Sequence, residues 1–367
     1  MAQELERNSF LSLVRLGIGH EDEPLPRTVD WPRMKELAER QLLSAIVFDG
    51  VLALIDRGAL NEGLAMEKRF KKLWIAEYIQ DESLVSDQKK AADEMAELFF
   101  RNGIKTYVLK GAVIAECYPK PDHRRSVDMD CFLVPQQGDS DVWELGNSLI
   151  RDKGYKVSDG FYKNSTFYLE GLTVENHRYL IPWRGNERLR SMEQLLQRLI
   201  RGAGQDDPGG VFEGSHMYRP PVLASALFLI EHAYSHFLHE GLTWRFVLDW
   251  VMFKARHASE IDWDAFNSYL DEFGMRTFYD AYSRLGSLLM GDIAEEALTP
   301  PERRMLSDIW APLDLHRNGG KGFRGKLALA GNTWRARWKY RLFTDLSWLQ
   351  ALWIQTRGVL FDRNPEL

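Results

Sequence analysis

The sequence is poor in cysteine and has no long hydrophobic run. Only Cys117 and Cys131 occur among 367 residues, too few for a disulfide framework or a cysteine-rich zinc site and typical of a reducing compartment. No apolar run approaches the roughly 18 residues of a membrane-spanning helix. The N-terminal residues lack the cationic start and apolar stretch of a secretory signal. We therefore expect a soluble, cytoplasmic protein.

The chain also has no excess of positive charge. Its formal net charge is -6 at pH 7, which excludes global attraction to nucleic acid or to an anionic membrane and leaves only local patches for such contacts. Hydrophobic residues make up 45% of the chain, enough for a sizeable core. At roughly 100 to 200 residues per domain, the length indicates two or three domains.

Helical periodicity dominates both ends of the chain, and β-like runs fill the middle. From Trp31 to about Phe100, apolar residues recur every three or four positions, and Gly103 marks the end of the last helix. After Pro182 the pattern is helical again. Four short runs between these regions favour β-strands: they lie near 104–109, 127–134, 165–170 and 172–181.

These elements predict an α+β fold with a small mixed sheet in an α/β core. We expect three parts along the chain: a helical N-terminal region at 1–95, the core at 96–185 and a helical C-terminal domain at 186–367.

Two aspartates stand one residue apart in the apolar run VDMDCFLV. Side chains alternate along a strand, so Asp128 and Asp130 project from one face. Unpaired carboxylates side by side raise each other's pKa, so the pair needs a divalent cation, a basic cluster or bulk water. Glu175, in LTVENHRYLI, is a third carboxylate on another strand. Three carboxylates on neighbouring strands are able to hold two metal ions for nucleotidyl transfer, and magnesium suits them; the alternative is solvated carboxylates on exposed strands.

A glycine turn precedes the aspartates. The run YVLKGAVIAECY predicts a strand, a turn at Gly111 and a short helix. The N–H groups of a helix N-terminus and the close approach that glycine permits suit phosphate oxygens, and Lys110 adds a positive charge. The alternative is a plain turn.

In order along the chain, LKGA, YPKP, DMDCFLV and VENH resemble a poorly characterised nucleotidyltransferase family within the DNA polymerase beta-like superfamily. The helical segment HAYSHFLHEGLTWRFVLDW is similar to one that follows the core in this family, so the resemblance covers roughly residues 30–260. It implies transfer of a nucleoside monophosphate from an NTP, ATP by default, to an acceptor hydroxyl with release of pyrophosphate. Two magnesium ions are the implied cofactors.

The resemblance also implies roles for individual carboxylates. Asp128, Asp130 and Glu175 would be the catalytic residues and the metal ligands. Glu175 would in addition activate the acceptor hydroxyl.

Phosphate binding is implied for the turn and for a basic position that follows it. Gly111 and Lys110 would form the phosphate-binding turn, and Arg124 matches a basic position of the family, with Arg125 the competing choice. Ala112 is a departure, because the wider superfamily usually has Ser or Thr beside the turn glycine. The hydroxyl contact to phosphate is therefore missing or is replaced by Lys110.

The acceptor is not specified by the sequence. Small hydroxylated molecules, sugars, protein side chains and tRNA ends all serve relatives of the superfamily. A toxin-like member that modifies tRNA or protein is one alternative. The other is a non-catalytic nucleotide-binding or scaffold protein that keeps the fold.

Further substrate contacts are expected near the carboxylates. His177 lies on the same strand face as Glu175 and either orients it, touches substrate or packs in the core. The resemblance permits a role for Asp249 near the cleft; the alternative is that Asp249 simply pairs with Arg245 one helical turn away.

A row of histidines invites a zinc interpretation. His232, His236 and His239 lie on one helical face, but the HExxH signature is absent. We expect helix packing or substrate contacts instead, with His236 the candidate for the latter.

The segment 317–341 is strongly basic. It holds eight Lys and Arg residues and no acidic one, with several tryptophans nearby. It either contacts RNA or an anionic surface, or forms a solvated helix face whose tryptophans fill the core.

Overall fold

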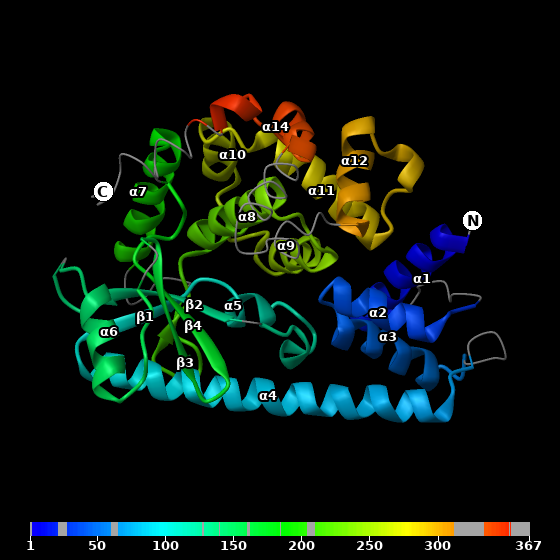
Figure 1. Ribbon diagram of the computed structural model, residues 1–367, viewed down its shortest axis with the longest axis horizontal. Helices are drawn as coiled ribbons and strands as arrows, with labels where there is room; N and C mark the ends of the chain where they lie inside the picture. The colour runs from blue at the N-terminus through cyan, green and yellow to red at the C-terminus, as the bar shows by residue number, and fades with distance from the viewer. Residues whose placement is uncertain are drawn as a thin grey trace, which may run out of the picture.

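A computed structural model describes residues 2–20, 28–59, 65–126, 128–138, 140–159, 162–183, 185–203, 210–311, 334–351 and 353. The protein is built around one five-stranded mixed sheet with helices on both sides, which confirms the predicted α+β fold (Figure 1).

The strands are β1 (Ile104–Val108), β2 (Asp128–Pro135), β3 (Asn164–Leu169), β4 (Leu172–His177) and β5 (Met217–Tyr218). The helices of the N-terminal half are α1 (Ala2–Gly17), α2 (Trp31–Arg40), α3 (Ser44–Asp56), α4 (Lys68–Arg101), α5 (Ala112–Ala115), the 3-10 turn η2 (Pro121–His123) and α6 (Trp143–Asp152). Those that follow are α7 (Glu187–Arg201), α8 (Val222–His239), α9 (Trp244–His257), α10 (Trp263–Glu272), α11 (Arg276–Met290), the 3-10 turn η3 (Glu295–Ala297), α12 (Pro300–Trp310) and α14 (Arg337–Phe343).

The sheet has the strand order β3-β4-β2-β1-β5. β2 pairs antiparallel with β1 and parallel with β4, and β5 pairs parallel with β1. Only the first residue of β2 is partly exposed, as expected of a central strand covered on both faces. The aspartates therefore belong to the innermost strand of the sheet.

The strands follow the predicted runs closely, with two differences. β4 ends at His177 instead of near 181, because the N–H groups of Arg178 and Tyr179 both turn to the carbonyl of Lys163. β5 was not predicted, since two residues are too short to give a periodic signal. It lies beyond residue 185, so the sheet draws on the chain on both sides of that expected boundary.

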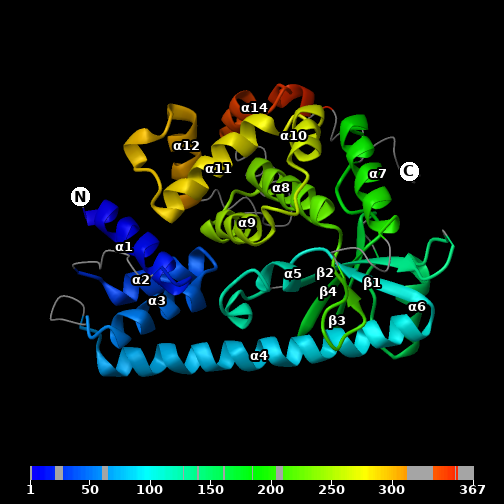
Figure 2. The same cartoon turned by 180° about the vertical axis from the view of Figure 1, so that it is seen from behind.

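Helix α4 connects the sheet region to the N-terminal helices. Its 34 residues run beneath the sheet at one end and reach α1, α2 and α3 at the other, and it passes through the expected boundary at residue 95 (Figure 2). Asn102 caps the helix, and Gly103 follows with φ +78°, which confirms the predicted stop. No helix in the described ranges has the length and hydrophobicity that crossing a membrane requires.

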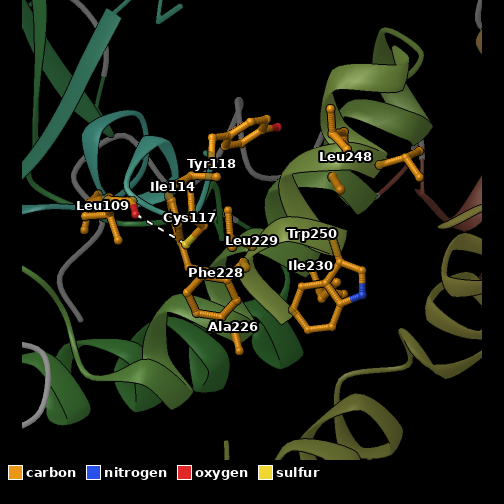
Figure 3. Close-up of a cluster of buried hydrophobic side chains, with 14 of the residues drawn as sticks. Leu109, Ile114, Cys117, Tyr118, Ala226, Phe228, Leu229, Ile230, Leu248 and Trp250 are labelled. Carbon is orange, nitrogen blue, oxygen red and sulfur yellow. Dashed lines mark hydrogen bonds between the residues drawn. The ribbon is translucent and has the colours of Figure 1, made fainter. Parts of the chain in front are cut away.

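The C-terminal helices are joined to the sheet region through a buried apolar cluster. In Figure 3, Ile114 of α5 and Cys117 of the turn after it lie beside Leu229 of α8, and Trp250 of α9 lies farther along α8. These four side chains are buried, and Tyr118 of the same turn reaches α9 through its hydrogen bond to Asp249. This packing fixes α8 and α9 beside the glycine turn and the N-terminal end of β2.

Candidate functional site

Strands β2 and β4 bring predicted carboxylates to one face of the sheet. Their parallel register pairs Asp130 with Glu175 and Asp128 with Thr173, and residues paired in this way project from the same face. The side chain of Asp130 is 3% exposed, whereas those of Asp128 and Glu175 are 32% and 31% exposed. The structure thus brings Asp130 and Glu175 together, with Asp128 at the mouth of the same face.

Lys110 stands across the two aspartates. Its Nζ lies 3.0 Å from Oδ2 of Asp130 and 3.7 Å from Oδ1 of Asp128. The contact with Asp130 is an ion pair without hydrogen-bond geometry, so Oδ2 is a buried oxygen with no hydrogen bond. Lys110 is therefore the counter-ion of this pair of carboxylates.

The two aspartates titrate differently. Burial by itself would raise the pKa of Asp130, but Lys110 and the hydrogen bond with His177 outweigh it and hold that pKa well below its usual value. The pKa of Asp128 is raised, mainly by burial and also by Asp130 and Glu175, although Lys110 opposes the rise. Asp130 is thus the firmly ionised member of the pair.

His177 is buried between carboxylates and a backbone carbonyl. Its Nε2 lies 3.0 Å from Oδ1 of Asp130 and 3.5 Å from Oε2 of Glu175, and its Nδ1 lies 3.1 Å from the carbonyl oxygen of Tyr179. The interaction with His177 is the main cause that lowers the pKa of Glu175. Sequence reasoning left open whether His177 orients Glu175 or packs in the core, and here it does both.

These side chains form a group with the composition of a metal site. Asp130, Glu175 and His177 each offer one ligand atom, and the three atoms lie within 4.8 Å of one another. Asp128 is outside this group and faces Lys110 instead. Carboxylate oxygens and a buried oxygen without a hydrogen bond fit a divalent cation, so the residues present suit the metal that the motif implies.

The glycine turn is as sharp as predicted but carries little helix. Gly111 has φ +69° and ψ -102°, a conformation that favours glycine. α5 has only four residues, so it offers a much weaker dipole than a full helix. A Cβ on Gly111 would lie 3.0 Å from Oγ of Ser126. The Ser126 hydroxyl therefore lies beside the turn in which Ala112 offers none.

Arg124 and Asp249 form a buried ion pair between η2 and α9. The guanidinium donates from Nε and Nη2 to the two oxygens of Asp249, at 3.0 and 2.6 Å, and from Nη1 to Oγ of Ser126 at 2.6 Å. The hydroxyl of Tyr118 donates to the same carboxylate at 2.8 Å. Asp249 thus pairs with Arg124 rather than with Arg245, which corrects the alternative of a simple pair along the helix.

Arg125 points away from this network. Its Nη1 donates to Asp81 of α4 at 2.9 Å, and its side chain is about half exposed. Of the two competing arginines, the structure places Arg124 beside the glycine turn.

A small pocket lies between the glycine turn and the C-terminal helices. It encloses about 30 Å³ of space open to water. Its lining comes from the turn, η2, β2, α8, α9 and α11: Lys110, Gly111, Arg124, Ser126, Asp128, Leu229, His232, Arg245, Phe246, Asp249, Trp250 and Tyr282. Cationic and neutral donors thus surround the mouth of the aspartate pair.

Arg245 and His232 are pocket residues that sequence reasoning did not select. Nε of Arg245 is buried without a hydrogen bond, and burial lowers the pKa of this arginine. Burial also lowers the pKa of His232 well below its usual value, so its ring is neutral at pH 7. His236, the histidine that was selected, instead pairs with Glu240 at 2.8 Å and stacks edge-on against His232.

The missed residues gave weak signals in the sequence. Ser126 stands two residues before Asp128, where only tertiary structure shows that its hydroxyl reaches Gly111. To choose His232 over His236, one must know which side of α8 faces the pocket. Because α8 is buried on most of its surface, its hydrophobic pattern does not indicate that side.

Most of the basic segment, residues 317–333, lies outside the described residues. In its described part, Arg337 stacks on Trp334 at 4.2 Å, and both side chains are exposed. Lys339 is buried, with its Nζ 2.7 Å from Asp308 and 2.7 Å from the carbonyl oxygen of Phe237. Lys339 thus belongs to the core rather than to a basic surface.

Comparison with known proteins identifies a family. A family model described as an uncharacterised nucleotidyltransferase matches residues 27–291, which include the whole sheet, the carboxylates and the pocket. No curated protein and no solved structure matches the chain. The matched range covers well over half of the sequence, and it confirms the resemblance drawn from the motifs. The chain therefore belongs to this family of uncharacterised nucleotidyltransferases.

Proposed function

We propose that the protein is a magnesium-dependent nucleotidyltransferase that moves a nucleoside monophosphate from an NTP, with ATP the first donor to test, to an acceptor hydroxyl. The acceptor oxygen bonds to the α-phosphorus, the bond from that phosphorus to the oxygen bridging to the β-phosphate breaks, and pyrophosphate leaves. The observation that carries the proposal is the convergence of Asp128, Asp130 and Glu175 beside a pocket of basic groups.

The three carboxylates share one task in this proposal, and Glu175 has a second. Asp128, Asp130 and Glu175 would hold divalent cations, which would neutralise the phosphates and the charge that develops on the leaving pyrophosphate. Glu175 also receives the proton of the acceptor hydroxyl, because it is the partly exposed carboxylate on the far side of Asp130 from Lys110.

The basic groups bind the donor phosphates. Arg245 has a buried Nε without a hydrogen bond, and Lys110, which faces the aspartates, would turn to the phosphates if cations were bound by these carboxylates. Arg124 has its guanidinium committed to Asp249 and Ser126, so it positions the hydroxyl of Ser126 beside Gly111. Charge-assisted contacts of this kind provide most of what transfer of a phosphoryl-type group requires.

The small size of the pocket has a consequence for donor binding. Its volume of about 30 Å³ is well below the roughly 300–1,000 Å³ of typical ligand sites. The phosphates enter only when side chains from α8, α9 and the turn move apart. The same closed pocket, with Lys110 across the aspartates, favours the second candidate, a non-catalytic scaffold.

The acceptor is proposed only by class: a small molecule, a sugar, a protein side chain or a tRNA end. If the acceptor is tRNA, binding through exposed residues of the basic segment, such as Arg335, Arg337 and Arg341, should weaken steeply as salt rises. A toxin-like role on tRNA or protein would give growth arrest on expression.

The test is ligand-dependent thermal stability. Wild type and Asp128→Asn are heated with each NTP, with and without Mg²⁺, because a ligand bound to the native state stabilises it by about 2.7 kcal/mol at a hundredfold excess over Kd. Asp128 is chosen because it is partly exposed, so its variant should fold. A magnesium-dependent rise with one NTP that the variant loses would support the proposal. If millimolar nucleotide stabilises neither protein, the donor-binding claim fails.

A further inference from the structure

The two oxygens of Asp130 face two different surroundings. Oδ2 faces the ammonium of Lys110, which also approaches Asp128. Oδ1 faces Nε2 of His177, which in turn lies 3.5 Å from Oε2 of Glu175. A cation on the first side meets only oxygen ligands, whereas a cation on the second side also meets an imidazole nitrogen.

The hydrogen bonds of His177 determine what its Nε2 is able to do. The carbonyl oxygen of Tyr179 only accepts, so Nδ1 carries a hydrogen and donates to it at 3.1 Å. Nε2 therefore faces two carboxylates, and both of these also accept. The ring is 1% exposed, which leaves no room for bulk water. The position between Nε2 and the two carboxylates thus calls for a cation, either a proton or a metal ion.

The surroundings of the ring match those of metal-binding histidines. Such histidines usually donate their other ring N–H to a backbone carbonyl or a carboxylate, which fixes the tautomer and turns the free nitrogen toward the metal. Here the ligand atoms of Asp130, Glu175 and His177 lie within 4.8 Å of one another, a spacing that one ion is able to span.

We propose that Asp130, Glu175 and His177 form a nitrogen–oxygen site for a divalent first-row transition ion, separate from the all-oxygen position between Asp128 and Asp130. The proposal rests on the proposed function in one respect, since that function also takes Asp130 and Glu175 as metal ligands. Magnesium and calcium prefer oxygen ligands, whereas an imidazole nitrogen favours transition ions. Three protein ligands leave coordination positions for water or substrate.

The experiment uses Mn²⁺ alone, without nucleotide, as a paramagnetic probe of the full-length protein. Pulsed electron spin echo spectra of the bound ion report directly coordinated nitrogen as ¹⁴N modulation. Wild type should show this modulation, and His177→Gln should lose it and bind Mn²⁺ about 10- to 100-fold more weakly, the range measured even for partners of metal ligands. His257→Gln is the matched control, since His257 lies on α9 and pairs with Glu260.

A second measurement avoids the risk that a buried substitution disturbs folding. Wild-type protein grown with ¹⁵N-histidine should replace the ¹⁴N pattern by a ¹⁵N pattern, because His177 is the only histidine in the described metal-site group. Bound Mn²⁺ without nitrogen modulation, or an unchanged spectrum after labelling, would overturn the inference. Transfer activity with Mg²⁺ but without nitrogen coupling would contradict this inference and leave the proposed function intact. Nitrogen coupling without any NTP binding would instead contradict the proposed function and support the metal site.

Discussion

The ammonium of Lys110 lies 3.0 Å from Oδ2 of Asp130 and 3.7 Å from Oδ1 of Asp128, where a cation bound between these carboxylates would be held. One positive charge thus offsets part of the negative charge of a buried and a partly exposed carboxylate. In the proposed function, a divalent cation held by these carboxylates would compete with Lys110 for the same oxygens, and a displaced Lys110 would be free to contact phosphate. Lys110, just before Gly111, would then couple metal binding to donor binding.

Lys110→Met tests this competition. Removing the ammonium should strengthen binding of Mg²⁺ or Mn²⁺ about tenfold, equivalent to roughly 1.4 kcal/mol, while weakening NTP binding. Isothermal titration calorimetry measures both affinities. Lys105→Met is the control, because Lys105 lies on β1, the strand before Lys110, and stacks on Tyr218, away from the aspartates. Weaker metal binding by Lys110→Met would contradict the competition.

Arg245→Met should impair donor binding with little effect on stability. Its Nε is buried without a hydrogen bond, and its Nη1 makes one long hydrogen bond of 3.4 Å to the carbonyl oxygen of Arg125, so loss of the guanidinium removes a desolvated charge and only one weak contact. One hydrogen bond from a charged group contributes about 1.5–3 kcal/mol, so NTP affinity should fall about 10- to 100-fold. Titration of NTP into the variant and into Arg256→Met, an exposed arginine on the same helix, checks this. Equal NTP affinities for the two variants would contradict a role for Arg245 in donor binding.

The features of this site that depend on residues close in the sequence could be predicted from it, whereas contacts between residues far apart in the sequence could not. Alternation along one strand placed Asp128 and Asp130 on one face, and the structure agrees because side-chain direction in a strand is local. Pairing with Glu175 required the register of two strands more than 40 positions apart, which the motif order supplied. The partner of Asp249 is Arg124, 125 positions away, and no local pattern specifies such a contact.

The glycine turn should tolerate no side chain. Gly111→Ala places a methyl group 3.0 Å from Oγ of Ser126 and forces alanine to adopt φ +69°, so we expect a loss of about 1–3 kcal/mol in unfolding free energy. Ser126→Ala alone should cost about 1.5–3 kcal/mol, because its hydroxyl accepts a hydrogen bond from the charged guanidinium of Arg124. Urea unfolding of both single variants and of the double variant measures these effects. A stability of Gly111→Ala equal to wild type would mean that residue 111 does not require a positive φ.

The buried pair of Arg124 and Asp249 should contribute more to placing the turn than to stability. Removal of one partner leaves an uncompensated charge, so Asp249→Ala should lose about 3–5 kcal/mol of unfolding free energy. The double variant Arg124→Met/Asp249→Leu should regain much of this stability, since an apolar replacement of a buried pair is often neutral. We expect it to remain defective in NTP binding, because Ser126 loses its hydrogen-bond donor. A double variant with wild-type NTP affinity would show that the pair only supports the fold.

Stability should fall as pH rises because of His123, which links η2 to the N-terminal helices. Its Nδ1 lies 2.6 Å from Oδ2 of Asp49 and its Nε2 lies 2.9 Å from Oε1 of Glu82, so the imidazolium donates to a carboxylate on each side. Burial by itself would lower the pKa of His123, but these two hydrogen bonds outweigh it and raise the pKa above 6.5. Folding raises the pKa of this imidazole. Its contribution to stability is therefore complete at pH values below the pKa of the unfolded state, near 6.5, and disappears as pH rises through the higher pKa of the folded state.

The melting temperature of wild type should therefore decline from pH 6 into the alkaline range relative to that of His123→Gln. The profile of the variant should be flatter, and lower at pH 6. Parallel profiles would mean that the imidazolium is not the form that joins Asp49 to Glu82.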